Sequence, residues 1–201
     1  AHLFEHMMFQ KSENVGEDQF FKIIQDAGGT LSGGTGNDAT TYYEVVPKNA
    51  LEKILWLESD RMGYMINTVT EKAFNIQQNV VQNEKRESND NRPYGHTSYV
   101  IDKNLFPEGH PYSWQVIGEM EDLFNATVED VKEFHAKFYV PNNATLTIAG
   151  DFDPDEVKAL VKKYFGEIPG GDKVADPEPM PVTLTDTKKF YHEDNLSLIH
   201  I

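Results

Sequence analysis

The sequence lacks cysteine altogether, and it has few basic residues and no long apolar run. Without cysteine there is no disulfide framework, no thiolate chemistry and no Cys-ligated metal, although this absence does not fix the compartment. No run approaches the roughly 20 apolar residues that cross a bilayer, so we expect no membrane insertion. Lysine and arginine number 18 against 33 acidic residues, for a formal charge of -15. That excess argues against nucleic acid and anionic membranes as partners, because both favour a basic surface.

What is present suits a folded domain. The 201 residues fit one domain, or one domain and the beginning of another, and 12 Phe, 9 Tyr and 2 Trp supply a sizeable core. Both ends are expected to be cut, because no initiator Met is present and residues 196–201 (LSLIHI) resemble the translation of a DNA-library adapter. We therefore exclude residues 196–201 from reasoning about the fold.

Residue periodicity predicts more helices than strands. Helices are expected at 17–27, 49–65, 70–88, 97–105, 127–139 and 153–165, the fifth opened by a Thr-x-x-Asp variant of the capping box. Strands are expected at 39–47, 144–149 and 182–190, with a glycine-rich hairpin before the first. The predicted fold class is α+β, a two-layer sandwich of a mixed or antiparallel sheet packed by helices.

The domain organisation follows from the same pattern. We expect a catalytic domain at 1–168 that lacks its N-terminal strands, a Pro/Gly-rich linker at 169–181, and the start of a second, similar domain at 182–195.

The first residues carry the main chemical signal. In a helix, His2 and His6 lie one turn apart on one face, with Glu5 beside them. Two imidazoles at this spacing can share one Zn²⁺, and a neighbouring carboxylate can accept a proton from water. The pattern is H-x-x-E-H, the inverted form of the H-E-x-x-H metallopeptidase signature. The alternative is an amphipathic helix with two ordinary histidines.

Several further stretches occur in a fixed order after this motif: GGTLSGGTGNDATTYYEVVP, VVQNEKRESNDNRPYG, HPYSWQVIG, FYVPNNATLTIAGDF and KYFGEIP. Together with HLFEHMMF they resemble the pitrilysin/insulinase family of zinc peptidases, which includes the mitochondrial processing peptidases. The resemblance runs from residue 1 to about residue 190.

The resemblance implies roles for individual residues. His2 and His6 match the two histidine ligands of one Zn²⁺ per catalytic domain, Glu5 matches the general base, and Glu84 matches the third ligand. Glu87 is the rival third ligand, and Glu84 is preferred because it follows the apolar pair at 80–81 and because the motif aligns there. Two histidines and one carboxylate leave a fourth position open, which is typical of a catalytic zinc.

The resemblance also points to a substrate-binding strand, at Ser32, Gly33, Gly34 and Thr35, to which an extended peptide adds by backbone hydrogen bonds. Ser32 stands where relatives usually carry Asn, which puts side-chain clamping of the substrate in doubt. Gln77 stands where some relatives have a second acidic residue that supports the metal site.

These residues predict a zinc-dependent endopeptidase that cleaves peptides or small unfolded proteins with a metal-activated water and Glu5 as general base. The alternative is a catalytically silent relative that serves as a partner or structural subunit. The expected partners are a peptide substrate and a second similar domain or subunit that closes over the cleft. The compartment stays open, with the bacterial periplasm or cell envelope favoured, and we expect the isolated chain to be inactive.

Overall fold

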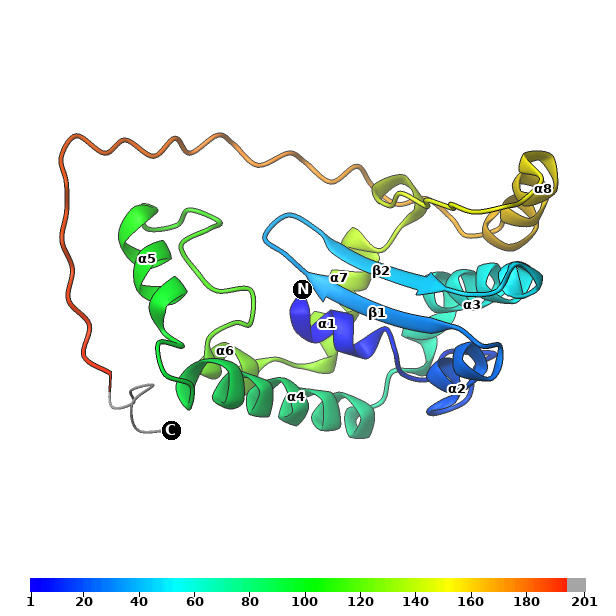
Figure 1. Ribbon diagram of the computed structural model, residues 1–201, viewed down its shortest axis with the longest axis horizontal. Coiled ribbons are helices and arrows are strands. Elements are labelled where there is room, and N and C mark those ends of the chain that lie inside the picture. The colour runs from blue at the N-terminus through cyan, green and yellow to red at the C-terminus, as the bar shows by residue number, and fades with distance from the viewer. Residues whose placement is uncertain (195–201) are drawn as a thin grey trace.

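The computed structural model describes residues 1–194, which form a helix-dominated α+β fold around one small sheet (Figure 1). The α-helices and strands are α1 (His2–Met7), α2 (Gln19–Asp26), β1 (Thr30–Thr35), β2 (Thr40–Val45), α3 (Leu51–Tyr64), α4 (Glu71–Lys85), α5 (Thr97–Leu105), α6 (Met120–Asn125), α7 (Val128–Phe138) and α8 (Pro154–Phe165). Short 3-10 turns lie at η1 (Lys48–Ala50), η2 (Met65–Thr68) and η4 (Pro141–Asn143), and a π-helical turn, η3 (Arg86–Asp90), follows α4. Within the described residues, no helix is long and apolar enough to cross a membrane.

The sheet is an antiparallel hairpin of β1 and β2, whose register pairs Thr30 with Val45 and Thr35 with Thr40. Alternating β-branched and aromatic residues favour the extended backbone of β2, and glycines shape β1 and the turn. Helix α1 packs against β1 and against α4, so the hairpin and α4 hold α1 between them (Figure 1).

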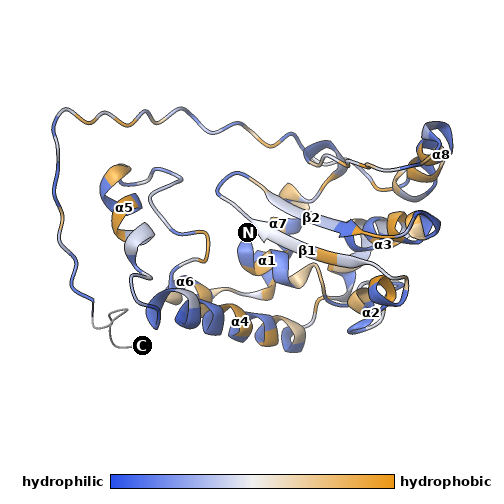
Figure 2. Ribbon diagram, viewed as in Figure 1, coloured by the Kyte–Doolittle hydropathy of each residue, from blue (hydrophilic) through white to orange (hydrophobic). Residues whose placement is uncertain are grey.

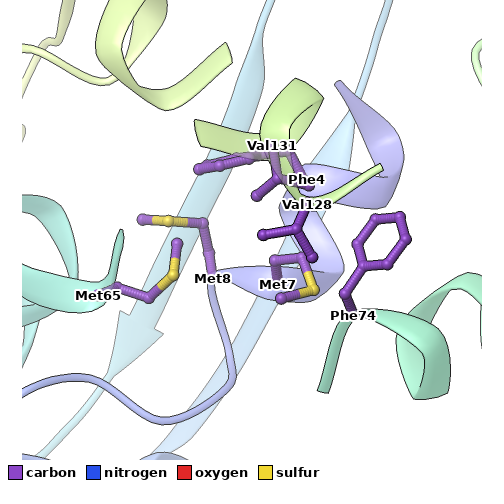
Figure 3. Packing of buried hydrophobic residues seen from close by; sticks show 7 residues of the cluster. All are labelled: Phe4, Met7, Met8, Met65, Phe74, Val128 and Val131. Atoms are coloured by element: carbon purple, nitrogen blue, oxygen red, sulfur yellow. The ribbon is translucent and has the colours of Figure 1, made fainter. Parts of the chain in front are cut away.

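Helix α1 is anchored by its apolar residues. Phe4, Met7 and Met8 are almost fully buried. Figure 3 shows them gathered with side chains from η2, α4 and α7: Met65, Phe74, Val128 and Val131. A helix of six residues has little stability of its own, so this packing is what fixes its orientation.

A second apolar cluster joins α2 to α3 beside the hairpin, through Val15, Phe20, Ile24, Ile54 and Leu57. The helices in Figure 2 accordingly show hydrophobic and hydrophilic stretches on different faces. Phe9, which follows α1, packs against this second cluster, so the two clusters together hold α1 and the residues just after it.

Most predicted elements are confirmed. All six predicted helices and the strand at 39–47 are present, and α7 begins with the predicted capping box: Asp130 N donates to the Thr127 hydroxyl, and Thr127 N donates to the Asp130 carboxylate. Helix α6 was not predicted. The helix expected to reach residue 88 ends as α4 at Lys85 and continues as η3, a π-helical turn.

Two predicted strands are wrong for this structure. Residues 144–149 and 182–190 form no ladder with any described segment, and most of their residues are exposed. A strand needs a neighbour to pair its backbone groups, and alternation of residue types supplies none. The predicted linker, 169–181, has no regular structure. The adapter-like residues 196–201 lie outside the described residues, and the domain boundaries remain a prediction.

Candidate metal centre

Helix α1 brings the two histidines together. The rings of His2 and His6 pack edge to face, with centroids 4.9 Å apart. Their spacing of four residues is one helical turn, and the buried opposite face of α1 directs both rings toward α4. The prediction that these imidazoles share one face of a helix is confirmed.

The third member of the cluster comes from α4. Glu84 Oε2 lies 3.3 Å from His6 Nε2 and 3.7 Å from His2 Nε2. One donor atom from each of the three residues lies within 4.8 Å of the other two. The rival residue, Glu87, is exposed in η3 and does not belong to this cluster.

The buried side of α4 explains this placement. Phe74 and Val81 are buried, and Val81 lies three residues before Glu84. Val80, the other residue of the apolar pair used to prefer Glu84, is 43% exposed rather than buried. The packing of Phe74 against α1 therefore sets the rotation of α4 that turns Glu84 toward the histidines.

The donor set fits Zn²⁺. Two imidazole nitrogens and one carboxylate oxygen are common zinc ligands, and bonds of about 2.0–2.2 Å in tetrahedral geometry put neighbouring donors about 3.3 Å apart. The His6–Glu84 separation of 3.3 Å already has this value. His2, His6 and Glu84 would hold the ion, and three protein ligands leave one position for substrate or water.

The local electrostatics favour ligation by His2. Burial lowers the pKa of His2, an effect that the nearby Glu84 carboxylate opposes and His6 reinforces. A lowered pKa keeps the imidazole neutral, which is the form that binds a metal. His2 Nδ1 is also buried, with no hydrogen-bond partner among the described residues.

Glu5 is buried between α1 and β1, with 8% of its surface exposed. Its Oε2 accepts a hydrogen bond of 2.6 Å from the Thr35 hydroxyl. Its Oε1 faces Gly33, where an added Cβ would lie only 2.8 Å from that oxygen. The predicted base therefore lies beside the histidine pair, with one oxygen held by β1 and the other packed against it.

The four predicted substrate-binding residues all lie in β1. Among the described residues, β2 is the only ladder partner of β1, so the other edge of β1 has no strand paired to it. The Ser32 hydroxyl donates a long 3.4 Å hydrogen bond to the carbonyl of Gly33. A Cβ added at Gly34 would meet no other atom within 4 Å, so there is open space beside this residue. The hydroxyl of Thr35, in contrast, is engaged by Glu5.

A buried arginine, Arg61, lies beside the hairpin and was not predicted from the sequence. The guanidinium of Arg61 lies over the rings of Phe20 and Tyr42, 4.8 and 4.3 Å from their centroids. It also contacts the carboxylates of Glu58, at 2.6 Å, and Glu44, at 3.3 Å. The pattern of charged residues on α3 resembles a solvated helix face, so no sequence signal distinguishes Arg61 from an exposed arginine.

Two other histidines are packed rather than grouped with acidic residues. His110 stacks on Phe106, and its Nδ1 accepts a hydrogen bond from Tyr112 N. His135 Nε2 lies 3.1 Å from the Met62 carbonyl. Neither belongs to the metal-binding group found among the described residues.

A helix-dominated α+β domain with two histidines on one short helix and a glutamate from a distant helix is typical of zinc peptidases with the inverted motif. Comparison with known proteins agrees. The sequence model "Insulinase (Peptidase family M16)" matches residues 1–104, and the model "Peptidase M16 inactive domain" matches residues 125–199. The chain belongs to the insulinase family, peptidase family M16.

Named relatives and solved structures support this membership. The chain is 34% identical over 186 residues to zinc protease PqqE of Helicobacter pylori, covering 89% of this chain and 40% of that protein. It is 23% identical over 205 residues to the mitochondrial-processing peptidase subunit beta of Saccharomyces cerevisiae, covering 100% of this chain and 43% of that subunit. A crystal structure of a protease from Helicobacter pylori superposes with a TM-score of 0.82 at 33% identity, covering 89% of this chain and 42% of that one. The chain therefore spans less than half the length of these relatives.

Proposed function

We propose that this chain carries the catalytic centre of a zinc-dependent endopeptidase. The observation that carries the proposal is the convergence of His2, His6 and Glu84 on one point, with Glu5 beside them. The relatives named zinc proteases support zinc as the metal. We propose one ion per catalytic domain, because one three-ligand cluster is found among the described residues.

The reaction is hydrolysis of a peptide bond. Zn²⁺ bound in such a site polarises the scissile carbonyl and makes water acidic enough to deprotonate near neutral pH. Glu5 accepts a proton from the attacking water and delivers it to the nitrogen of the leaving amine. Its burial and its hydrogen bond from Thr35 hold the carboxylate in one position beside β1.

The open edge of β1 favours an extended substrate. A peptide that adds to Ser32–Thr35 as a further strand makes backbone hydrogen bonds that do not depend on its sequence. Most backbone groups of a folded protein are already hydrogen-bonded, so the substrates that we propose are peptides and small unfolded proteins.

The proposal extends to the whole protein. Further strands complete the predicted two-layer sandwich, and a second similar domain or subunit closes over the cleft. The yeast relative is named as subunit beta of a peptidase, which is consistent with a second subunit in that enzyme. A structural neighbour described as the periplasmic protease PqqL of Escherichia coli supports a periplasmic location, at 23% identity.

Metal analysis of the full-length protein tests the ligand set. We expect about one zinc per catalytic domain and its loss in Glu84→Gln, since one of three protein ligands is weakened. Glu87→Gln is the matched control, because Glu87 is a nearby exposed glutamate outside the cluster. Full zinc occupancy in Glu84→Gln, with loss in Glu87→Gln, would contradict the assignment of the third ligand.

The role of Glu5 is tested separately. Glu5→Gln should lower kcat for a peptide by about 10²–10⁴-fold while zinc stays bound, because the amide cannot accept the proton. Near-normal turnover by zinc-loaded Glu5→Gln protein would contradict the mechanism.

A second candidate function has one observation in its favour. Residues 125–199 match the model described as an inactive domain, so the chain could belong to a silent subunit of a larger assembly. That function predicts no zinc-dependent peptidase activity in the wild-type full-length protein and no effect of Glu5→Gln.

A further inference from the structure

Thr35 lies at the end of β1, and its side chain faces α1 rather than solvent. Its hydroxyl donates a 2.6 Å hydrogen bond to Glu5 Oε2 and lies 3.1 Å from the Thr40 hydroxyl. Thr40 is the residue directly opposite Thr35 in the hairpin register. We infer that Thr35 is a positioning residue that fixes the Glu5 carboxylate, rather than a residue that binds substrate through its side chain. This inference rests on the proposed function.

The direction of the hydrogen bonds supports this role. A threonine hydroxyl carries one hydrogen, and Thr35 gives it to Glu5. Because that hydrogen is taken, a hydrogen bond between the two threonines needs Thr40 as its donor, and the Thr40 hydroxyl also interacts with Tyr139. An O–H···O bond near 2.6 Å to a carboxylate lies in the range of charge-assisted hydrogen bonds, and a second donor that polarises the first hydroxyl strengthens it.

The two partners differ in stiffness. A glutamate has three side-chain torsions, whereas threonine is β-branched, so its χ1 angle is restricted. The strand backbone and the cross-strand contact with Thr40 hold the Thr35 hydroxyl in place. The stiffer residue therefore sets the position of the more flexible one.

The other carboxylate oxygen has no free space on the strand side. A Cβ at Gly33 would lie 2.8 Å from Glu5 Oε1 and 3.0 Å from the ring of Phe9. Glu5 is thus held at Oε2 by a hydrogen bond and packed at Oε1 against the backbone of β1. Without the Thr35 hydroxyl, Oε2 loses its only side-chain donor among the described residues.

The test compares three variants of the zinc-loaded full-length protein. Thr35→Val keeps the shape and removes the hydroxyl, whereas Thr35→Ser keeps the hydroxyl. Thr41→Val is the matched control, because Thr41 lies in the same hairpin but is exposed. Peptide hydrolysis, zinc content and the midpoint of thermal unfolding are measured for each.

Thr35→Val should lower kcat about ten- to a hundredfold, as the loss of a supporting hydrogen bond does in metal sites. KM should stay within about twofold and zinc content should be unchanged, because neither the strand edge nor a ligand is altered. Thr35→Ser should recover most of the rate, and Thr41→Val should behave as wild type. A normal kcat in Thr35→Val, a loss confined to KM, or a Thr35→Ser protein as slow as Thr35→Val would overturn the inference.

A crystal structure of the Thr35→Val protein supplies a second readout, which does not depend on turnover. We expect the Glu5 carboxylate to leave the position seen beside β1, and an unchanged position would overturn the inference. If the wild-type protein hydrolyses no peptide, the proposed function fails, and the position of Glu5 in this crystal structure still decides the role of Thr35.

Discussion

Arg61 is the residue whose environment departs furthest from expectation, since it is charged and only 1% exposed. A guanidinium in such a place is stabilised by aromatic faces and by carboxylates, and Arg61 has both. Two acidic groups share this one cation. Burial, followed by the charge of Glu58, raises the pKa of Glu44 to about 8, and Arg61 only partly offsets these effects.

The raised pKa of Glu44 predicts a pH-dependent stability. From its ordinary value of 4.5 up to about 8, the folded state keeps a proton that the unfolded state releases. The contribution of Glu44 to stability is therefore fully present below pH 4.5 and is lost as the pH rises toward 8. Glu44→Gln imitates the protonated side chain, so it should match wild type near pH 5 and melt higher at pH 8, by about 3 °C or more.

Thermal unfolding of the full-length protein at several pH values measures this effect. Glu52→Gln is the control, because Glu52 is fully exposed and its bonds to Lys163 and Tyr164 lower its pKa, the opposite direction. A difference between Glu44→Gln and wild type that does not change with pH would contradict the assignment.

Among the elements, α7 supports α1 from outside the candidate site. Its residues Val128 and Val131 pack in the same cluster as Phe4 and Met7 of α1. The helix begins at a capping box formed by Thr127 and Asp130, so the first turn that carries Val128 depends on these hydrogen bonds. The cap of α7 and helix α1 are therefore linked through packing.

The capping box of α7 is expected to contribute to stability. Thr127→Ala should destabilise the full-length protein by about 1 kcal/mol, because the Asp130 amide loses its acceptor. Thr127→Ser keeps the acceptor and should stay close to wild type. Urea denaturation compares the two, and an equal loss in both variants would show that the methyl group of Thr127, rather than its hydroxyl, is what matters.

Across the described residues, apolar side chains remain exposed on the hairpin and on the C-terminal segment. Val45 on the hairpin is 64% exposed, and Leu184 and Phe190 on the C-terminal segment are each 52% exposed. Figure 1 shows that segment running away from α8 and passing around α5 without regular structure. Soluble proteins normally cover such surface.

We therefore expect residues 1–201, expressed alone, to bind a hydrophobic dye, to self-associate and to hydrolyse no peptide. A net stability of only about 5–15 kcal/mol cannot offset a large uncovered apolar surface. Dye fluorescence, gel filtration and a peptidase assay, each run beside the full-length protein, test this. A monomer that melts cooperatively and shows zinc-dependent peptidase activity would contradict it.

The sequence by itself determined most of the helices, the hairpin and the histidine pair. Each depends on residues close together in the chain: His2 and His6 one turn apart, Thr127 and Asp130 at the cap, and alternation along β2. Local hydrogen bonds and helical spacing follow from such neighbours. The choice of Glu84 over Glu87 was also reached from the sequence, but through the family resemblance, and its role as a ligand remains a proposal.

The tertiary structure alone decided what depends on distant partners. Residues 144–149 and 182–190 have strand-like sequences, yet no described strand lies beside them to complete a ladder. The bond from Thr35 to Glu5 joins residues 30 apart, and the aromatic surroundings of Arg61 come from three separate segments. Such contacts are set by how α1, α3 and the hairpin pack, and packing is a property of the whole set of elements that no short stretch of sequence contains.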